Sequence, residues 1–327
     1  GELCAVADGP SRGEVAPVVA FASARGEYLV VWYNDRAGND DIRAQRFSSA
    51  GDPLGGPFYV AAGPGAERRL PDVAYDGVHD QYLVVWLHDA GLGEAVHGRR
   101  VSGGGGVLDA GDLVIRDAGA SLYSPERPAV AYASTSDRFL VVWPETWHPS
   151  PITWFVEGRL VTSAGALDGS PFDIATTSSG NALSTVDVAY NRRRNEHLVV
   201  WQKLDDASGL QDVYSRRVTG GGLPLSPEAI EIARYTVSST RPRVAAIPAI
   251  GSEGTYMVVW ELLDSAGDHD VYARTVDGLG ATGSPMGLVV SGTDETAPGV
   301  SGWETSEEFL VTWSTLSTSP LVVSTVH

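Results

Sequence analysis

Residues 28–32 read Tyr-Leu-Val-Val-Trp, and a version of this pentapeptide occurs six times along the chain. The copies are Tyr28–Trp32, Tyr82–Trp86, Phe139–Trp143, His197–Trp201, Tyr256–Trp260 and Phe309–Trp313. Their tryptophans follow one another at intervals of 53 to 59 residues. A repeat of this period indicates a ring or stack of equivalent units, each of which needs its neighbours to bury a core.

Each repeat contains four segments typical of β-strands. The first resembles Pro71–Tyr75, and the second is the tryptophan segment, whose consecutive apolar residues predict burial on both faces. The third resembles Asp212–Val218 and the fourth Ile230–Ala233. Four short strands joined by turns rich in glycine, aspartate and serine are typical of one blade of a β-propeller. A linear β-solenoid is the alternative, although its ends need distinct caps.

The predicted fold class is therefore an all-β, six-bladed β-propeller with four antiparallel strands per blade, formed by residues 1–327 as a single domain. Blades are expected at about residues 16–63, 70–117, 127–176, 185–234, 241–291 and 297–327. The last repeat ends after its third strand, whereas residues 2–7 have the composition of a fourth strand with nothing before it. We expect residues 2–7 to complete the last blade, because this closes the ring without a free edge.

The third strand of every repeat carries a small residue, such as Gly98 or Gly158, which predicts a bulky ring packed over it, most simply the repeat tryptophan. An arginine follows in four repeats. These arginines are Arg99, Arg159, Arg216 and Arg274. A charge on a buried strand needs a partner, so we expect ion pairs with the aspartates of the repeat.

Composition limits the classes of partner. The chain has 327 residues and a net charge of −18, which repels nucleic acid and anionic lipid surfaces. Cys4 is the only cysteine, which excludes an internal disulfide, and no apolar run approaches 18 residues, so no membrane span is expected. Lys203 is the only lysine, a bias typical of a high-GC bacterial source. We expect a monomer located outside the cytoplasm: extracellular, periplasmic or at the cell surface.

The repeat resembles those of bacterial secreted or cell-surface β-propellers with degenerate blade sequences, and the resemblance covers the whole chain. No named repeat matches: kelch glycine pairs and WD dipeptides are absent, and the sialidase Asp-box is only echoed at Ser134–Trp143, where the glycine spacing fails. The lysine-rich phosphate site of β-propeller phytases has no counterpart in a chain with one lysine. The resemblance implies that ligands bind on the face that carries the links between blades.

The loop of blade three departs most from the repeat. It runs from Trp143 to Phe155 and contains three prolines, which reduce the entropy lost on binding. Exposed aromatic rings beside hydrogen-bonding groups suit a carbohydrate or a protein surface, whereas the alternative is local packing over the blade edge. The predicted ligand-binding residues are Trp147, His148, Trp154, Tyr123, Arg127 and Arg69.

Acidic loops on the same face are candidate calcium sites. The candidate ligands are Asp35, Asp40, Asp205 and Asp264. Oxygen-rich clusters are what calcium requires, but none of these loops has the spacing of a calcium-binding loop. Capping of tight turns by the same side chains is the alternative, and no other cofactor is expected.

Catalytic residues are not evident from any motif, because G-x-S-x-G and phosphate-binding loops are absent. Asp72 and Asp187 occupy the variable position of the first strand and are the candidate catalytic carboxylates. His88, His97 and His148 could meet Glu94 or Glu145 at a metal. The leading function is thus a binding module for carbohydrate or protein, and the alternatives are a hydrolase or lyase at the channel mouth and a structural scaffold.

Overall fold

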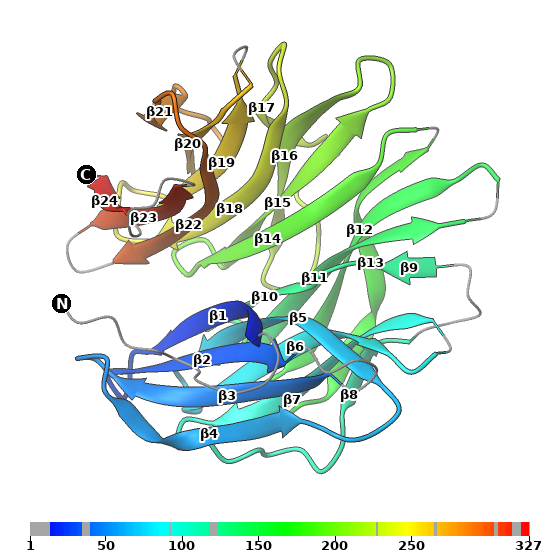
Figure 1. Ribbon diagram of the computed structural model, residues 1–327, viewed down its shortest axis with the longest axis vertical. Coiled ribbons are helices and arrows are strands. Elements are labelled where there is room, and N and C mark those ends of the chain that lie inside the picture. Colours follow the sequence, from blue (N-terminus) through cyan, green and yellow to red (C-terminus); the bar gives the residue numbers. More distant parts are fainter. Residues whose placement is uncertain are drawn as a thin grey trace. The chain divides into compact units, whose positions relative to one another are not determined.

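The regular structure consists entirely of β-strands in the part of the chain that the computed structural model describes. That part comprises residues 14–34, 40–91, 93–117, 123–148, 150–178, 180–226, 228–264, 267–303, 307–315 and 322–326. Its 24 strands form six antiparallel sheets, in each of which consecutive strands pair in sequence order (Figure 1). The described residues contain no helix that could span a membrane.

The chain divides into two compact units. The first comprises Gly1–Thr146 and Arg159–Pro171, and the second comprises Trp147–Gly158 and Phe172–His327. Two sheets belong to the first unit. They are β1 (Glu14–Ala22), β2 (Glu27–Asn34), β3 (Asp41–Ser48) and β4 (Pro53–Ala61), and β5 (Glu67–Asp76), β6 (Gln81–Asp89), β7 (Glu94–Ser102) and β8 (Leu113–Arg116).

The third sheet contributes residues to both units. It contains β10 (Ala129–Ala133), β11 (Arg138–Trp147), β12 (Thr153–Thr162) and β13 (Leu167–Ser178), and β9 (Tyr123–Pro125) pairs with β11.

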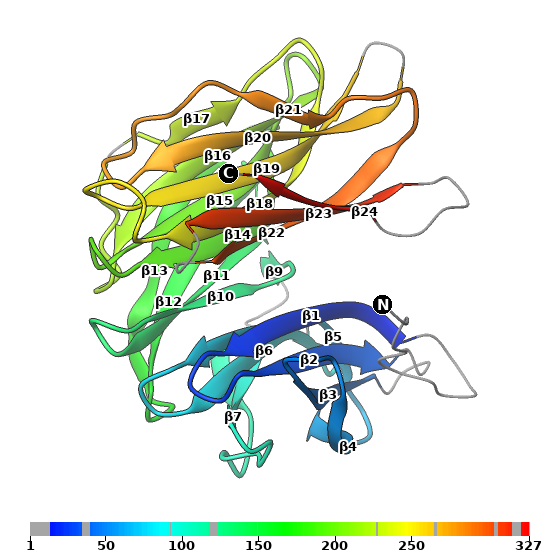
Figure 2. The same cartoon turned by 90° about the vertical axis from the view of Figure 1, so that its left-hand side faces the viewer.

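Three sheets belong to the second unit, and Figure 2 shows two of them, β14–β17 and β18–β21, as neighbours. The strands are β14 (Leu183–Asn191), β15 (Glu196–Asp205), β16 (Leu210–Thr219) and β17 (Ile230–Ala233), then β18 (Ser239–Ile247), β19 (Thr255–Leu263), β20 (His269–Asp277) and β21 (Met286–Val289), and finally β22 (Glu295–Trp303), β23 (Glu308–Thr315) and β24 (Val322–Val326).

Within each unit the first strands of successive sheets pack together: β1 on β5 and β5 on β10 in one, β14 on β18 and β18 on β22 in the other. This is the blade arrangement of a β-propeller. The count differs from the prediction of six four-stranded blades, because the structure shows five complete blades. The sixth sheet has three strands among the described residues. Residues 2–7, predicted to supply its fourth strand, lie outside them.

The repeat tryptophans lie in the core, as predicted. All six are at most 4% exposed. The middle of β6, β11, β15 and β19 is buried on both faces, whereas β2 and β23 alternate between buried and partly exposed residues.

The repeat arginines link successive blades through carbonyl oxygens rather than through the predicted aspartate pairs. Each guanidinium donates an Nη1 hydrogen bond to the fourth strand of the preceding blade. The bonds run from Arg99 to Val60, from Arg159 to Ile115, from Arg216 to Ile174 and from Arg274 to Ile232, at 2.6 to 3.0 Å. Backbone oxygens satisfy the charge here, and Arg99 alone among the four also pairs with an aspartate, Asp112, in the described residues. A side chain at Gly98 or Gly158 would meet Ile115 or Ile174 at 3.0 Å, so the close neighbour is the fourth strand and not the tryptophan ring.

A strained residue recurs at the start of the first strand. Left-handed backbone angles, with φ between 45° and 52°, occur at Ala16, Leu70, Thr185, Arg241 and Ala297. The pairing register with the second strand shifts at each of these positions. A non-glycine residue in this conformation strains the backbone, and the contacts around the bulge must offset the free energy of that strain. These bulges form part of the candidate site described next.

Candidate functional site

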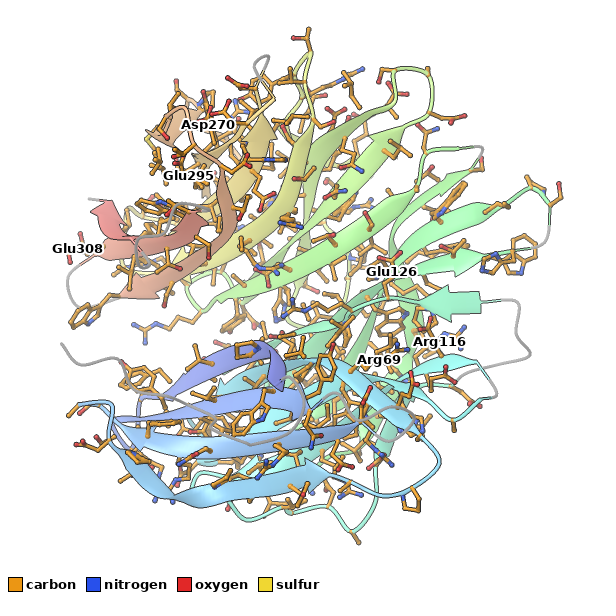
Figure 3. The ribbon with its side chains drawn as sticks, viewed as in Figure 1. Arg69, Arg116, Glu126, Asp270, Glu295 and Glu308 are labelled. Carbon is orange, nitrogen blue, oxygen red and sulfur yellow. The ribbon has the colours of Figure 1, made fainter. Side chains whose placement is uncertain are left out.

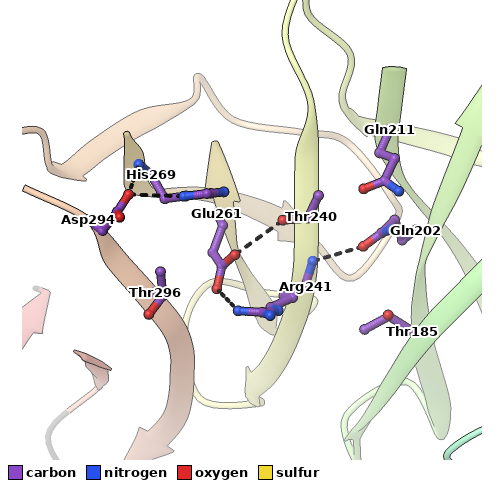
Figure 4. A pocket seen from close by; sticks show the side chains of 9 residues that line it. All are labelled: Thr185, Gln202, Gln211, Thr240, Arg241, Glu261, His269, Asp294 and Thr296. Atoms are coloured by element: carbon purple, nitrogen blue, oxygen red, sulfur yellow. Dashed lines mark hydrogen bonds and ion pairs between the residues drawn. The ribbon is translucent and has the colours of Figure 1, made fainter. Parts of the chain in front are cut away.

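The second unit contains a pocket of about 450 Å³ that is lined by residues with polar side chains (Figure 4). We call it the Arg241 pocket. Its lining residues are Thr185, Gln202, Gln211, Thr240, Arg241, Glu261, His269, Asp294 and Thr296. The volume lies within the range of small-molecule sites, which usually have mostly apolar walls. A wall of polar side chains therefore selects for a ligand that makes many hydrogen bonds.

The sheet topology brings these residues to one edge of three consecutive blades. They come from the starts of β14, β18 and β22, the ends of β15 and β19, the starts of β16 and β20, and the link before β22. This edge carries the inter-blade links and the loops between second and third strands. It is the face on which a ligand site was predicted, but blades four to six build the pocket, and no predicted site residue lines it.

Arg241 and Glu261 form the charged centre of the pocket. Nη1 of Arg241 lies 3.0 Å from Oε1 of Glu261, whose side chain is 2% exposed, whereas the arginine side chain is 59% exposed. Thr240 donates its hydroxyl to the other oxygen of Glu261 at 3.3 Å. The buried carboxylate thus holds the guanidinium at the pocket wall, with the remainder of the arginine facing the solvent.

Two residues of this wall also join neighbouring blades. Oε1 of Gln202 accepts the backbone N–H of Arg241 at 3.1 Å, and Oε1 of Glu261 accepts that of Ala297 at 2.6 Å. In both cases the donor is the left-handed residue of the following blade. Sequence reasoning missed Gln202 and Glu261. The available signal was a polar residue directly after a repeat tryptophan, where the other blades have Tyr33, Leu87, Pro144 and Ser314.

His269 and Asp294 form a hydrogen-bonded pair on the opposite side of Glu261 from Gln202 in Figure 4. Oδ1 of Asp294 lies 3.1 Å from Nδ1 of His269 and accepts its backbone N–H at 2.9 Å. These bonds lower the pKa of Asp294, the side-chain bond most of all. An ionised carboxylate only accepts, so Nδ1 carries a proton and Nε2 is left to exchange one.

The link that carries Asp294 is held by two buried carboxylates, Asp270 and Glu295 (Figure 3). Asp270 accepts the backbone N–H of Ser291 at 3.1 Å. Glu295 accepts the hydroxyls of Ser291 and Thr293, each at 2.7 Å. Burial raises the pKa of Asp270, although the bond from Ser291 partly opposes this. These contacts fix the position of Asp294 relative to His269.

The predicted binding residues of blade three do not come together within one unit. Trp147, at the end of β11, and Trp154, near the start of β12, are half-buried and His148 is exposed, and all three belong to the second unit. The loop between them contains a cis Ser150–Pro151 bond. The other predicted residues belong to the first unit.

In the first unit, Arg69 pairs with Glu67 and Glu94, at 3.2 and 3.6 Å, and Arg127 is half-buried. Tyr123 lies in β9, but its side chain falls outside the described residues. A role for this group in binding stays a prediction.

The candidate catalytic carboxylates occupy equivalent positions and make equivalent contacts. Oδ2 of Asp72 accepts the backbone N–H of Val130 at 2.8 Å, and Oδ2 of Asp187 accepts that of Val244 at 2.9 Å. In each case the donor belongs to the first strand of the following blade. These bonds join blades, a structural role that the sequence pattern did not indicate.

The predicted calcium ligands cap turns or lie apart from one another. Asp205 accepts the backbone N–H of Ala207, and Asp264 accepts that of Gly267 at 2.8 Å. Asp40 is buried, and Asp35 lies outside the described residues. Among the described residues none of these carboxylates belongs to a group of three or more potential metal ligands, so calcium binding rests on the sequence alone.

Glu94 and Glu145, the predicted metal partners of the histidines, make other contacts. Glu145 pairs with Arg116, which Figure 3 labels, and accepts a hydrogen bond from Nε1 of Trp143 at 3.0 Å. Glu94 pairs with Arg69. In both cases the carboxylate is paired with an arginine, and neither carboxylate belongs to a cluster of potential metal ligands among the described residues.

Comparison with known proteins relates the chain through its fold. No protein family and no curated protein matches the sequence. A Dyadobacter fermentans protein of unknown function has a similar structure, with a TM-score of 0.64 and 12% identity over 95% of this chain and 93% of that one. The Hadza microbial sialidase Hz136 matches with a TM-score of 0.61 and 11% identity, over 95% of this chain and 65% of that one. Trypanosoma rangeli sialidase in complex with the inhibitor DANA matches with a TM-score of 0.59 and 7% identity, over 96% of this chain and 54% of that one. At these identities the likeness establishes the β-propeller fold.

Proposed function

We propose that this chain acts on carbohydrate through the Arg241 pocket. The observation that carries the proposal is the lining of the pocket, in which amide, hydroxyl and charged side chains alternate over about 450 Å³. Sugar hydroxyls donate and accept hydrogen bonds at closely spaced positions, so a wall of mixed donors and acceptors satisfies them. An apolar ligand would leave without partners those donors and acceptors of the wall that do not already pair with one another, at a cost of about 1–3 kcal/mol for each such group that it buries.

Hydrolysis of a glycosidic bond is the better supported of the two predicted activities, binding alone and enzymatic action. His269, oriented by Asp294, provides an imidazole that can serve as a general acid or base. Two of the solved structures that share this fold are described as sialidases, which supports a glycan as the substrate class. In this proposal Arg241 and the threonine hydroxyls orient the sugar. Nε2 of His269 takes a proton from the water that attacks the anomeric carbon, the glycosidic C–O bond breaks, and the leaving oxygen takes a proton from solvent.

The test is turnover of a panel of fluorogenic aryl glycosides, neutral and acidic, together with binding to a glycan array. His269→Gln should lower kcat by about 10²- to 10⁴-fold, the usual contribution of proton transfer by a positioned side chain, with little change in the melting temperature. Trp147→Ala is the matched control and should retain activity.

Three outcomes would change the proposal. If no glycan is bound or cleaved, carbohydrate is the wrong ligand class. Glycan binding without turnover, unaffected by His269→Gln, would leave a binding module. Loss of binding in Trp147→Ala with the His269 variant unaffected would move the site to the blade-three loop and restore a carbohydrate or protein surface as its ligand.

The finer architecture is also part of the proposal: a closed, monomeric six-bladed ring acting outside a bacterial cell, with residues 2–7 as the last strand. Closure would add a fourth strand to the sheet β22–β24, which has three strands among the described residues. Deletion of residues 1–8 should therefore lower the melting temperature sharply. An unchanged melting temperature would refute closure by this segment.

A further inference from the structure

A second cluster of chemically reactive side chains lies in blade two, a sheet that contributes nothing to the Arg241 pocket. It consists of His88 in β6, His97 in β7 and Asp112 immediately before β8. One donor atom from each side chain lies within 4.8 Å of the donor atoms of the other two. The cluster thus has two imidazole nitrogens and a carboxylate oxygen in one place.

The strand register explains why these three side chains meet. His97 pairs with Trp86, two residues before His88, and also with Val114, two residues after Asp112. Residues directly opposite one another, and residues two apart on one strand, project from the same face of a sheet. The three side chains therefore share one face of blade two.

The contacts within the cluster leave donor atoms unused. The rings of His88 and His97 stack at 4.0 Å, with an angle of 7° between their planes. Nδ1 of His97 lies 3.2 Å from Oδ2 of Asp112. Nδ1 of His88 is buried and makes no hydrogen bond in the described part of the chain. A buried nitrogen without a partner is unusual in a native protein and points to an additional ligand such as an ion.

We propose that His88, His97 and Asp112 bind a transition-metal ion, with zinc as the best-matched one. Imidazole nitrogen is a preferred ligand of zinc, copper, nickel and iron, whereas calcium and magnesium prefer oxygen. Zinc bonds of about 2.0–2.2 Å to nitrogen and oxygen place the donors of a tetrahedral site about 3.3 Å apart. Imidazole lone pairs lie in the plane of the ring, so at least one of the two stacked rings turns out of its present orientation when both bind the same ion.

The surrounding charges narrow the choice of metal further. Nε of Arg99 lies 2.7 Å from Oδ1 of Asp112 and so orients the carboxylate. An ion bound to Oδ2 replaces the contact of that oxygen with Nδ1 of His97. Arg68 pairs in register with His88 and adds a second positive charge nearby. Two cations oppose an ion held by electrostatic attraction alone. The two arginines therefore favour a metal ion that forms strong bonds to imidazole nitrogen.

The experiment is metal titration of the full chain after treatment with a chelator, with Zn²⁺ followed by calorimetry and Co²⁺ by visible absorbance. One ion should bind per chain, and Co²⁺ should show the ligand-field bands of four-coordinate nitrogen and oxygen ligation. His88→Gln and His97→Gln should each weaken binding by about 10- to 100-fold or more, since they remove direct ligands. Zn²⁺ should raise the melting temperature of the wild type, whereas Ca²⁺ should not.

The control is His79→Gln, which alters the other His/Asp cluster among the described residues, Asp76–His79–Asp137. It should bind Zn²⁺ as the wild type does. The proposal is overturned if the wild type takes up no stoichiometric Zn²⁺, if His88→Gln binds it equally well, or if His79→Gln is the variant that loses it. Far-UV circular dichroism of each metal-free variant shows whether the blade has folded, and His97→Gln decides the question if His88→Gln has not.

Discussion

Replacement of His197 by phenylalanine should remove a large part of the acid sensitivity of this protein. His197 takes the place of the aromatic residue that begins the tryptophan strand in the other repeats. It is completely buried, and neither ring nitrogen has a hydrogen-bond partner of normal geometry. Its ring packs on Tyr190 at 5.1 Å, as Phe139 packs on Tyr132 at 4.9 Å in blade three. Phenylalanine therefore fits this position.

The magnitude follows from the pKa of His197. Burial lowers this pKa from 6.5 to about 4, and the backbone of Thr219 and Val218 offsets only part of the effect. Above pH 6.5 the histidine is neutral in the folded and unfolded chains, so its contribution to stability does not vary. Between pH 6.5 and about 4 only the unfolded chain gains the proton, and the free energy of unfolding falls as pH falls. A pKa difference of this size corresponds to a total change of about 3 kcal/mol in the free energy of unfolding.

The assay is urea unfolding of the wild type and of His197→Phe at pH 7, 6, 5 and 4, monitored by tryptophan fluorescence. The difference in free energy of unfolding should grow by about 3 kcal/mol in favour of the variant between pH 7 and pH 4. His148→Gln, at an exposed histidine, is the control and should follow the wild type. A difference that stays constant with pH would refute the reasoning, because it would mean that buried His197 takes up its proton as readily as it does in the unfolded chain.

Three further predictions concern the contacts between blades. Arg274→Ala should lower the free energy of unfolding by about 2–4 kcal/mol, since it removes charged hydrogen bonds to Gly283 and Ile232; Arg274→Gln, which copies the natural glutamine of blade one, should cost less, and equal losses in the two variants would contradict this. Asp187→Ala should lower the free energy of unfolding by about 1–3 kcal/mol in chemical denaturation, with turnover per folded molecule unchanged. Loss of turnover in a stable variant would instead restore Asp187 as a catalytic residue. Asp270→Asn should raise the melting temperature at pH 7, because burial raises the pKa of this carboxyl and so makes its ionised form unfavourable in the folded state; a lower melting temperature that persists at pH 4 would show that the contacts to the link dominate.

Much of the fold could be predicted from the pentapeptide repeat. The fourth strand Ile230–Ala233 has the predicted bounds, and the tryptophan strands lie in the core. Such features depend on local periodicity, which each repeat displays in its own residues. The partners of the repeat arginines were predicted wrongly because backbone carbonyls accept their hydrogen bonds, and every residue has a carbonyl whatever its side chain.

The pocket could not be predicted in the same way. Its lining residues come from three repeats between Thr185 and Thr296, and singly each resembles a polar strand end that faces solvent. Glu261 illustrates the difficulty. In the sequence it is one of 41 acidic residues, yet the structure buries it between Arg241 and the backbone of Ala297.

The sequence by itself therefore determined the strand pattern, the repeat and the β-propeller class, because the run of apolar residues that recurs in each repeat specifies the strand that is buried on both faces. Tertiary structure alone decided which side chains converge. The Arg241 pocket depends on left-handed bulges at the starts of successive blades, where the backbone contacts the neighbouring blade. The His88–His97–Asp112 cluster depends on the register between three strands. The pocket joins residues of three repeats and the cluster joins three strands of one blade, so both are fixed by packing and pairing that no single segment encodes.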